Sequence, residues 1–226
     1  MEDLNRRQVL AAMAALGVTG AAMAGGSRTG VAPAQEIVMS PYKNEHFYGA
    51  DGKFDAEKGK AAYYELMAKY HVPVSDYLKA NVWATDFGLG DFVHAGMGGI
   101  FWVNEKDFGY FGHEIYLLPG QMIVEHAHVA TDKPAKMESW QVRNGWVYLF
   151  GEGAESPEAA KLIPESQQKF TTARNVNRLD VGGAVRLAAI GQKHFMMGGS
   201  EGALVTEYAT YHDGAGLRFT NPGVKF

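Results

Sequence analysis

The stretch Gly120-Gln121-Met122-Ile123-Val124-Glu125-His126-Ala127-His128 decides the fold that this sequence encodes. Successive side chains of a β-strand point to opposite faces, so His126 and His128 project to the same side of one strand. Lys136 and Glu138 share a face for the same reason. This pattern favours a metal site that is built on the strands of a β-barrel.

Three imidazoles and one carboxylate would form this site, from His126, His128, Glu138 and His194. Such a mixed set of nitrogen and oxygen ligands suits borderline divalent ions such as Mn, Fe, Co, Ni or Zn, and it leaves positions open for water or substrate. A His-x-His pair also occurs by chance, with rings that only form hydrogen bonds on a polar face. Here an apolar strand over 114–118 and a Gly-Gln turn precede the pair, and a Lys-x-Glu strand follows it, which favours ligation.

Composition limits the class of protein. The 226 residues, of which 46% are hydrophobic and 12% aromatic, suit one domain of barrel or sandwich type. The net charge of −4, with no basic cluster beyond the first seven residues, argues against a nucleic-acid partner. The chain has no cysteine, which excludes disulfides, zinc-thiolate sites and cysteine nucleophiles.

The first 34 residues predict the compartment. Arg6 and Arg7 precede an Ala- and Gly-rich apolar run over 10–24, and small residues follow it, as in a twin-arginine export signal. An ordinary N-terminal helix or a membrane anchor is the alternative, but the run is shorter than the roughly 20 residues that a membrane span needs. We expect a periplasmic protein that has no membrane partner once residues 1–34 are removed.

One helix is predicted after the signal. Asp55 can cap a helix over 56–70, and Tyr63, Leu66 and Met67 fall on one of its faces. From residue 100 the chain reads as short strands: 100–104, 113–118, 121–128, 136–142, 145–150, 184–190 and 203–210. The domains expected are the signal (1–34), an N-terminal extension with one helix (35–99) and an all-β barrel (100–226).

Two connections are also predicted. Asn144-Gly145 is a typical two-residue hairpin turn, because a primed turn requires positive φ at both positions. The polar, Glu-rich segment over 151–169 reads as an exposed connection or a rim loop.

The motifs together resemble the D-lyxose ketol-isomerase family of cupins. The resemblance rests on His126-x-His128, Lys136-x-Glu138, a lone His194 and a C-terminal strand with Glu207, and it covers roughly half of the chain. It implies a cupin barrel, that is, a double-stranded β-helix or jelly roll. The loop between His128 and Lys136 is longer than in the tightest versions of the motif, and an export signal is unusual for an enzyme of pentose use.

The resemblance also implies the roles of the residues. His126, His128, Glu138 and His194 would bind a divalent metal, usually manganese, with Zn, Co, Fe and Ni as alternatives. Lys136 and Glu207 would assist the interconversion of an aldose and a ketose through a metal-stabilised enediolate. We expect the protein to bind a small-molecule sugar as its substrate. A homodimer is one assembly that the chain could form.

The residues leave several alternatives open. Glu207 could be only a strand carboxylate in the barrel wall, and Lys136 could form only an ion pair with Glu138. A cupin with this ligand set could also be a dioxygenase, or a periplasmic sugar-binding protein without turnover. We expect four other histidines to be hydrogen-bonding rings of the core or surface: His46, His71, His94 and His113. His212 is expected at the rim of the pocket. Four aromatic side chains are expected to line the pocket: Trp140, Trp146, Phe195 and Phe219.

Overall fold

The computed structural model describes residues 38–226, so the expected export signal lies outside the described residues. The elements in chain order are η1 (Asn44–Phe47), α2 (Ala56–Lys69), α3 (Asp76–Asn81), β1 (Trp83–Thr85), β2 (Met97–Glu105), β3 (Tyr110–Leu117), β4 (His126–His128), β5 (Glu138–Gly151), α4 (Ala159–Leu162), α5 (Glu165–Gln168), β6 (Asn175–Asp180), β7 (Ala184–Arg186), β8 (His194–Thr210), η2 (Gly214–Gly216) and β9 (Leu217–Phe219).

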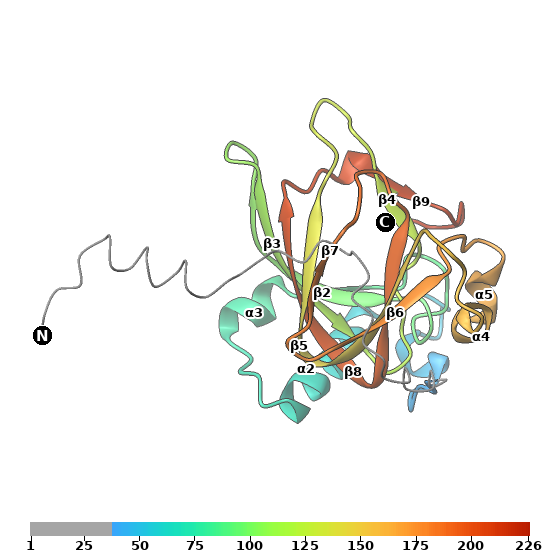
Figure 1. Ribbon diagram of the computed structural model, residues 1–226. Coiled ribbons are helices and arrows are strands. Elements are labelled where there is room, and N and C mark those ends of the chain that lie inside the picture. The colour runs from blue at the N-terminus through green and yellow to red at the C-terminus, as the bar shows by residue number, and fades with distance from the viewer. Residues whose placement is uncertain (1–37) are drawn as a thin grey trace, which may run out of the picture. The chain divides into compact units, whose positions relative to one another are not determined.

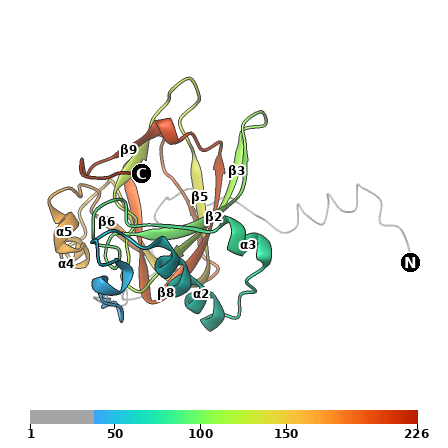
Figure 2. The ribbon, with the colours of Figure 1, turned by 180° about the vertical axis from the view of Figure 1, so that it is seen from behind.

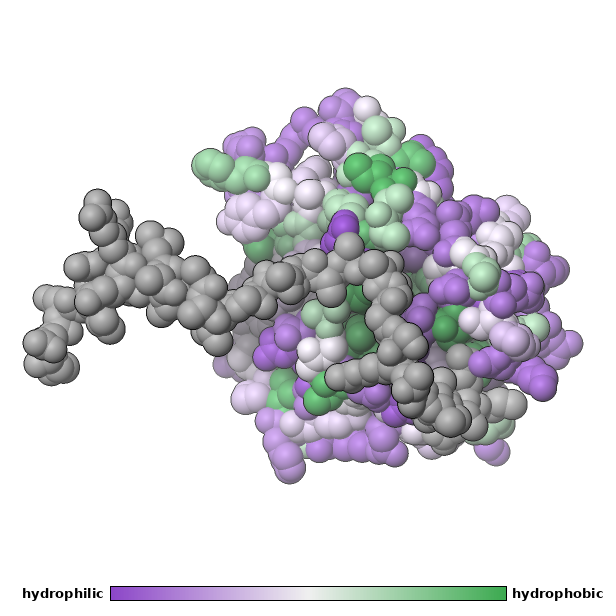
Figure 3. Space-filling view, in the orientation of Figure 1, coloured by the Kyte–Doolittle hydropathy of each residue, from purple (hydrophilic) through white to green (hydrophobic). Residues whose placement is uncertain are grey.

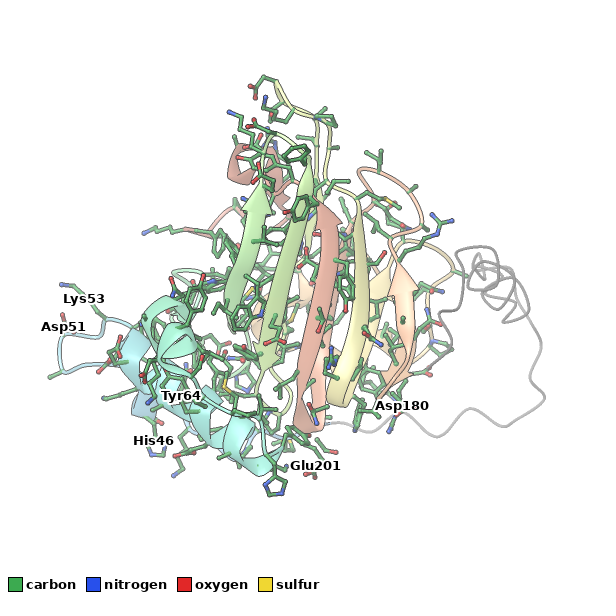
Figure 4. The ribbon with its side chains drawn as sticks, turned by 90° about the vertical axis from the view of Figure 1, so that its left-hand side faces the viewer. His46, Asp51, Lys53, Tyr64, Asp180 and Glu201 are labelled. Atoms are coloured by element: carbon green, nitrogen blue, oxygen red, sulfur yellow. The ribbon has the colours of Figure 1, made fainter. Side chains whose placement is uncertain are left out.

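The strands form one curled antiparallel sheet, as Figure 1 shows. Its main path runs β1-β2-β3-β8-β4-β9, and β5 pairs with β8 and also with β6 and β7. Figure 4 shows β2, β3, β8 and β5 side by side, with helices at one corner of the sheet. The prediction of an all-β fold with a helical segment before it is confirmed.

The two long strands, β5 and β8, determine the register. They pair from Glu138 opposite Ala209 to Gly151 opposite His194, over the full length of β5. Strand β3 pairs with the second half of β8, so that half lies between β3 and β5. The first residue of β8 also pairs with β4. Strand β8 therefore contacts β4 at its first residue and β5 along its length, and these strands carry the predicted site residues.

The predicted hairpin at Asn144-Gly145 is wrong. Strand β5 continues through both residues, and the register against β8 shifts on either side of them, as in a β-bulge. Gly145 has a φ of 69°, and a Cβ there would lie 2.0 Å from the backbone oxygen of Gly202. A glycine with positive φ serves a bulge as well as a turn, so the Asn-Gly pair alone does not separate the two.

Several predicted strands differ in extent from the observed ones. The strand expected over 121–128 is regular only at His126–His128, the one over 184–190 ends at Arg186, and the one over 203–210 begins already at His194. Strand β6 and helices α3, α4 and α5 were not expected. Both α4 and α5 have four residues, which is too short for a helical period to be visible in the sequence.

Helices cover two sides of the sheet, as Figure 2 shows from behind. Helix α2 begins at the predicted cap, where Asp55 accepts hydrogen bonds from the backbone N–H groups of Glu57 and Lys58 at 3.1 and 3.4 Å. Its buried face packs on a cluster with strands β2 and β3, while Leu162 of α4 packs on a separate cluster with β5 and β8. Asp180, the last residue of β6, and Glu201, within β8, are charged residues that Figure 4 labels.

The described surface is mixed in polarity. Figure 3 shows a largely hydrophilic face with separate hydrophobic residues. None of the helices within residues 38–226 combines the length and the apolar character that are needed to cross a membrane.

A buried hydrogen-bond network attaches α2 to the segment that connects β3 with β4. The hydroxyl of Tyr63, which is fully buried, donates to Oε1 of Gln121 at 2.7 Å. The amide of Gln121 also accepts from the backbone N–H of Leu118 and donates to the carbonyl of Phe92. Polar groups in a core are stable only when they are paired in this way, so the network fixes how the helix meets the barrel.

We expect Tyr63→Phe to lower the free energy of unfolding by about 1 kcal/mol, because it removes one buried hydrogen bond and leaves Gln121 its other partners. Urea denaturation measures the change. The control is Tyr64→Phe, at the neighbouring, half-exposed tyrosine that Figure 4 labels, whose hydroxyl makes no hydrogen bond within the described part of the chain. Equal losses in the two variants would contradict the role of this network.

Candidate metal centre and sugar pocket

The structure brings the four predicted ligands together. His126 and His128 lie on β4, Glu138 begins β5, and His194 begins β8 opposite His126. One nitrogen or oxygen atom of each residue lies within 4.8 Å of the corresponding atom of every other. The group therefore has the composition and spacing of a site that could hold a divalent metal.

Backbone hydrogen bonds orient two of the imidazoles. Nδ1 of His126 lies 3.0 Å from the carbonyl oxygen of Val124, and Nδ1 of His194 lies 2.9 Å from that of Gln192. A ring whose Nδ1–H donates to a carbonyl presents Nε2 as its free ligand atom. These two contacts fix both the tautomer and the direction of each ring.

The ligand atoms face one another without hydrogen bonds. Nε2 of His128 lies 3.0 Å from Oε1 of Glu138, and Nε2 of His194 lies 2.8 Å from Oε2. Both Nε2 atoms and Oε2 are buried, and none forms a hydrogen bond of good geometry with the described residues. Buried polar atoms need partners, and a bound cation would satisfy all three at once.

Burial and the neighbouring charges set the protonation of the cluster. Burial lowers the pKa of His126 well below its usual value, and His194 and His128 lower it further, so the ring is neutral and able to bind a metal. Burial alone would raise the pKa of Glu138, but the Lys136 charge and the two imidazoles hold it well below its ordinary range. Burial lowers the pKa of His194, yet the charge of Glu138 outweighs this and the net shift is upward.

Lys136 lies between two carboxylates. Its Nζ is 2.7 Å from Oε1 of Glu138 and also contacts Oε1 of Glu207, and all three side chains are buried. Burial lowers the pKa of Lys136, but Glu207 and Glu138 raise it more, so the ammonium stays charged. The ion pair with Glu138 that the sequence left as an alternative is present, and it extends to Glu207.

Glu207 has a second partner, which the sequence did not connect with the site. His113 lies opposite Glu207 in the β3–β8 pairing, and its Nδ1 is 3.1 Å from Oε2 of Glu207. The His113 ring stacks on Trp83, with centroids 5.6 Å apart. The sequence predicted only a hydrogen-bonding ring here; its one available signal is the position of this histidine among apolar residues on one face of a strand.

One pocket contains all of these groups. Its volume, including the open mouth, is about 570 Å³. His212 lines it, as expected, and burial together with Lys136 lowers the pKa of this histidine to about 4. Three of the four aromatic residues expected in the lining, Trp140, Phe195 and Phe219, are there.

Trp146 is the exception among the expected pocket aromatics. It packs in a different cluster against Tyr148, with ring centroids 4.8 Å apart, and the guanidinium of Arg178 lies 4.0 Å from its ring. The β-bulge at Gly145 shifts the register of β5 between Trp140, which lines the pocket, and Trp146, which does not. His94 also lies outside the pocket, where it pairs with Asp91 at 2.7 Å.

Comparisons with known proteins identify relatives among sugar isomerases. No family model matches the chain. A D-lyxose/D-mannose isomerase of Thermosediminibacter oceani is 31% identical over 163 residues, which cover 72% of this chain and 88% of the relative. A D-lyxose ketol-isomerase of Cohnella laeviribosi is 29% identical over 163 residues, which cover 71% of this chain and 87% of the relative.

Solved structures share the fold at lower identity. The L-ribose isomerase of Cellulomonas parahominis without ligand aligns with a TM-score of 0.60 and 14% identity, over 79% of this chain and 95% of that one. The L-ribose isomerase of an Acinetobacter species in complex with L-ribose aligns with a TM-score of 0.57 and 15% identity, over 74% and 90%. These likenesses confirm the cupin barrel. The identity to the Thermosediminibacter enzyme, across most of that enzyme's length, shows that the chain belongs to the D-lyxose ketol-isomerase family of sugar isomerases.

Proposed function

We propose that the protein interconverts an aldose and the corresponding ketose in this pocket, with a divalent metal as cofactor. One observation carries the proposal: the Lys136–Glu207 pair lies directly beside a buried group of three histidines and one glutamate. The named relatives act on D-lyxose and D-mannose, so small aldoses of five or six carbons are the substrates to test first.

The metal would be held by His126, His128, Glu138 and His194. Manganese is the first choice because the family resemblance implies it, and Zn, Co, Fe and Ni also suit these ligands. A divalent ion held by these residues would act as a Lewis acid and stabilise the negative charge that develops on the sugar oxygens.

Glu207 is our candidate for the proton transfer. The carboxylate would take the proton from C2 of the aldose, which gives the enediolate form of the sugar, and return it to C1, while the proton of the C2 hydroxyl passes to the oxygen on C1. His113 holds one oxygen of this carboxylate and Lys136 holds the other, so its position is fixed. The Lys136 ammonium would donate a hydrogen bond to the oxygen on which charge develops.

The ligand set has a second candidate function, as a dioxygenase, because oxygen-using cupins employ the same kind of site. The relatives favour isomerisation, which consumes no oxygen. An assay without oxygen separates the two functions: the isomerase forms ketose at an unchanged rate, whereas product that forms only with oxygen would overturn the isomerase proposal.

We expect the protein to retain about one divalent metal ion per chain, and His126→Ala with His128→Ala to abolish both metal content and isomerase activity. Elemental analysis of the purified protein and a sugar assay measure the two effects. The matched control is His46→Ala with His94→Ala, at two exposed histidines outside the pocket. Full metal occupancy in the His126 and His128 double variant would refute the assignment of the ligands.

We expect Glu207→Gln to lower turnover by a factor of about 10² to 10⁴, which is the usual contribution of a general acid or base, and to leave the metal in place. Turnover of aldose in heavy water should place deuterium at C1 or C2 of the wild-type product. The control is Glu201→Gln, at an exposed carboxylate of the same strand β8. Near-normal turnover of Glu207→Gln would move the base to another residue, with His212 as the next candidate.

We propose in addition that residues 1–34 export the folded protein to the periplasm by the twin-arginine pathway. A reporter fused after residue 34 should cross the membrane, and replacing Arg6 and Arg7 by Lys should retain it in the cytoplasm, because the paired arginines are the part of the signal that is recognised. Cell fractionation measures this, with Arg28→Lys in the same segment as the control. If the doubly substituted signal still directs export, the proposed pathway is wrong.

A further inference from the structure

Neighbouring strands bring Trp83, Gly99 and His113 onto one face of the sheet. Trp83 of β1 lies directly opposite Gly99 of β2. His113 of β3 lies opposite Phe101, two residues further along β2, and also opposite Glu207 of β8. Residues that lie opposite each other in an antiparallel sheet, or two apart along one strand, share a face. All five positions are therefore on the side of the sheet that faces the pocket.

Gly99 leaves open a space that the His113 ring occupies. A Cβ atom on residue 99 would lie 2.3 Å from Nε2 of His113 and 3.0 Å from Cζ2 of Trp83. It would also lie 2.8 Å from the backbone oxygen of Glu114. These distances are far inside the roughly 3.5–4.0 Å of ordinary contact between carbon atoms. Any side chain at this position would therefore push the imidazole away from β2.

The Trp83 indole borders the same space. It stacks on the His113 ring, with centroids 5.6 Å apart and an angle of 21° between the planes. Its Nε1 is buried and makes no hydrogen bond with the described residues, although an unpaired buried N–H is costly. The contact that the indole makes with His113 is thus through its face and not through its hydrogen-bond donor.

Hydrogen bonding holds the His113 ring at one point only. Nδ1 lies 3.1 Å from Oε2 of Glu207, and both side chains are buried. An ionised carboxylate only accepts hydrogen bonds, so the ring donates through Nδ1. Nε2 has no hydrogen-bond partner among residues 38–226. The packing of the ring between Trp83 and the backbone at Gly99 therefore supplies the second constraint on its orientation.

We propose that Trp83 and Gly99 act as positioning residues through the His113 ring. They hold the ring at the angle at which Nδ1 fixes one oxygen of the Glu207 carboxylate. The inference rests on the proposed isomerase function, in which this carboxylate transfers the proton. Because Lys136 contacts the other oxygen, loss of the His113 contact would leave Glu207 held at one oxygen only. A displacement of about 1 Å in a reacting group lowers turnover by up to about 100-fold.

The first test compares two neighbouring glycines of β2 on the metal-loaded enzyme. Gly99→Ala places a methyl group against the His113 ring, whereas Gly98→Ala places one 2.3 Å from the Tyr63 ring on the opposite face. We expect Gly99→Ala to lower kcat by about 10- to 100-fold, with metal content unchanged and KM within about 3-fold of the wild-type value. Gly98→Ala should lower stability in urea and retain kcat. Equal kcat values in the two variants would overturn the inference and leave the isomerase function intact.

A conservative replacement separates positioning from general damage to the strand. In His113→Asn the amide can donate from the place of Nδ1, but no atom occupies the place of Nε2. Gly99→Ala in this background loses its closest clash and keeps the one with the backbone oxygen of Glu114. We expect it to lower kcat there by less than about 3-fold. An equal loss in both backgrounds would show that Gly99 acts on the strand and not through His113, which overturns the proposal.

A pair of tryptophan variants tests the stacking partner. We expect Trp83→Leu to lower kcat and to leave KM and metal content nearly unchanged. The control is Trp102→Leu, at a 42% exposed indole that stacks on Tyr77 and lies outside the pocket lining. A rise in KM at unchanged kcat in Trp83→Leu would show that the indole binds substrate instead, which overturns its positioning role. If the wild-type enzyme converts no aldose to ketose, the proposed function and this inference fail together.

Discussion

The buried group of two carboxylates and one ammonium, formed by Glu138, Lys136 and Glu207, is the interaction on which the rest of the site depends. The three residues are only 3%, 5% and 4% exposed, so water does not screen their charges. Removal of Lys136 would leave the carboxylates of Glu138 and Glu207 buried without their ammonium partner, at a cost of about 3–5 kcal/mol. Two carboxylates against one ammonium leave one excess negative charge, and a divalent cation on Glu138 and the imidazoles would offset it.

The strand register places these charges in contact. Glu207 on β8 lies opposite His113 on β3 and opposite Trp140 on β5, so its side chain is enclosed from both neighbouring strands. Because side chains alternate between the faces of a sheet, a slip of one residue would turn Glu207 to the outer face and separate it from Lys136. The long pairing of β5 with β8 opposes such a slip, and the bulge at Gly145 adjusts the register locally.

How much of this could be read from the sequence depends on the separation of the residues along the chain. His126 with His128, and Lys136 with Glu138, are two residues apart, and the strand period alone puts each pair on one face. The Glu207 partner His113 is 94 residues away, and nothing local indicates which strand will lie beside β8. The pocket lining combines residues from Trp83 to Phe226, so its composition becomes visible only in the fold.

The pocket lining combines a charged network with apolar side chains. In the charged network each side chain is held by another, as Lys136 is by two carboxylates, so a substitution there disturbs several residues at once. The phenylalanine rings of the lining, such as Phe87 and Phe219, make apolar contacts, so one ring can change without leaving a buried charge. The charged network and the phenylalanine lining are therefore under different constraints, because only a substitution in the network changes the balance of buried charge.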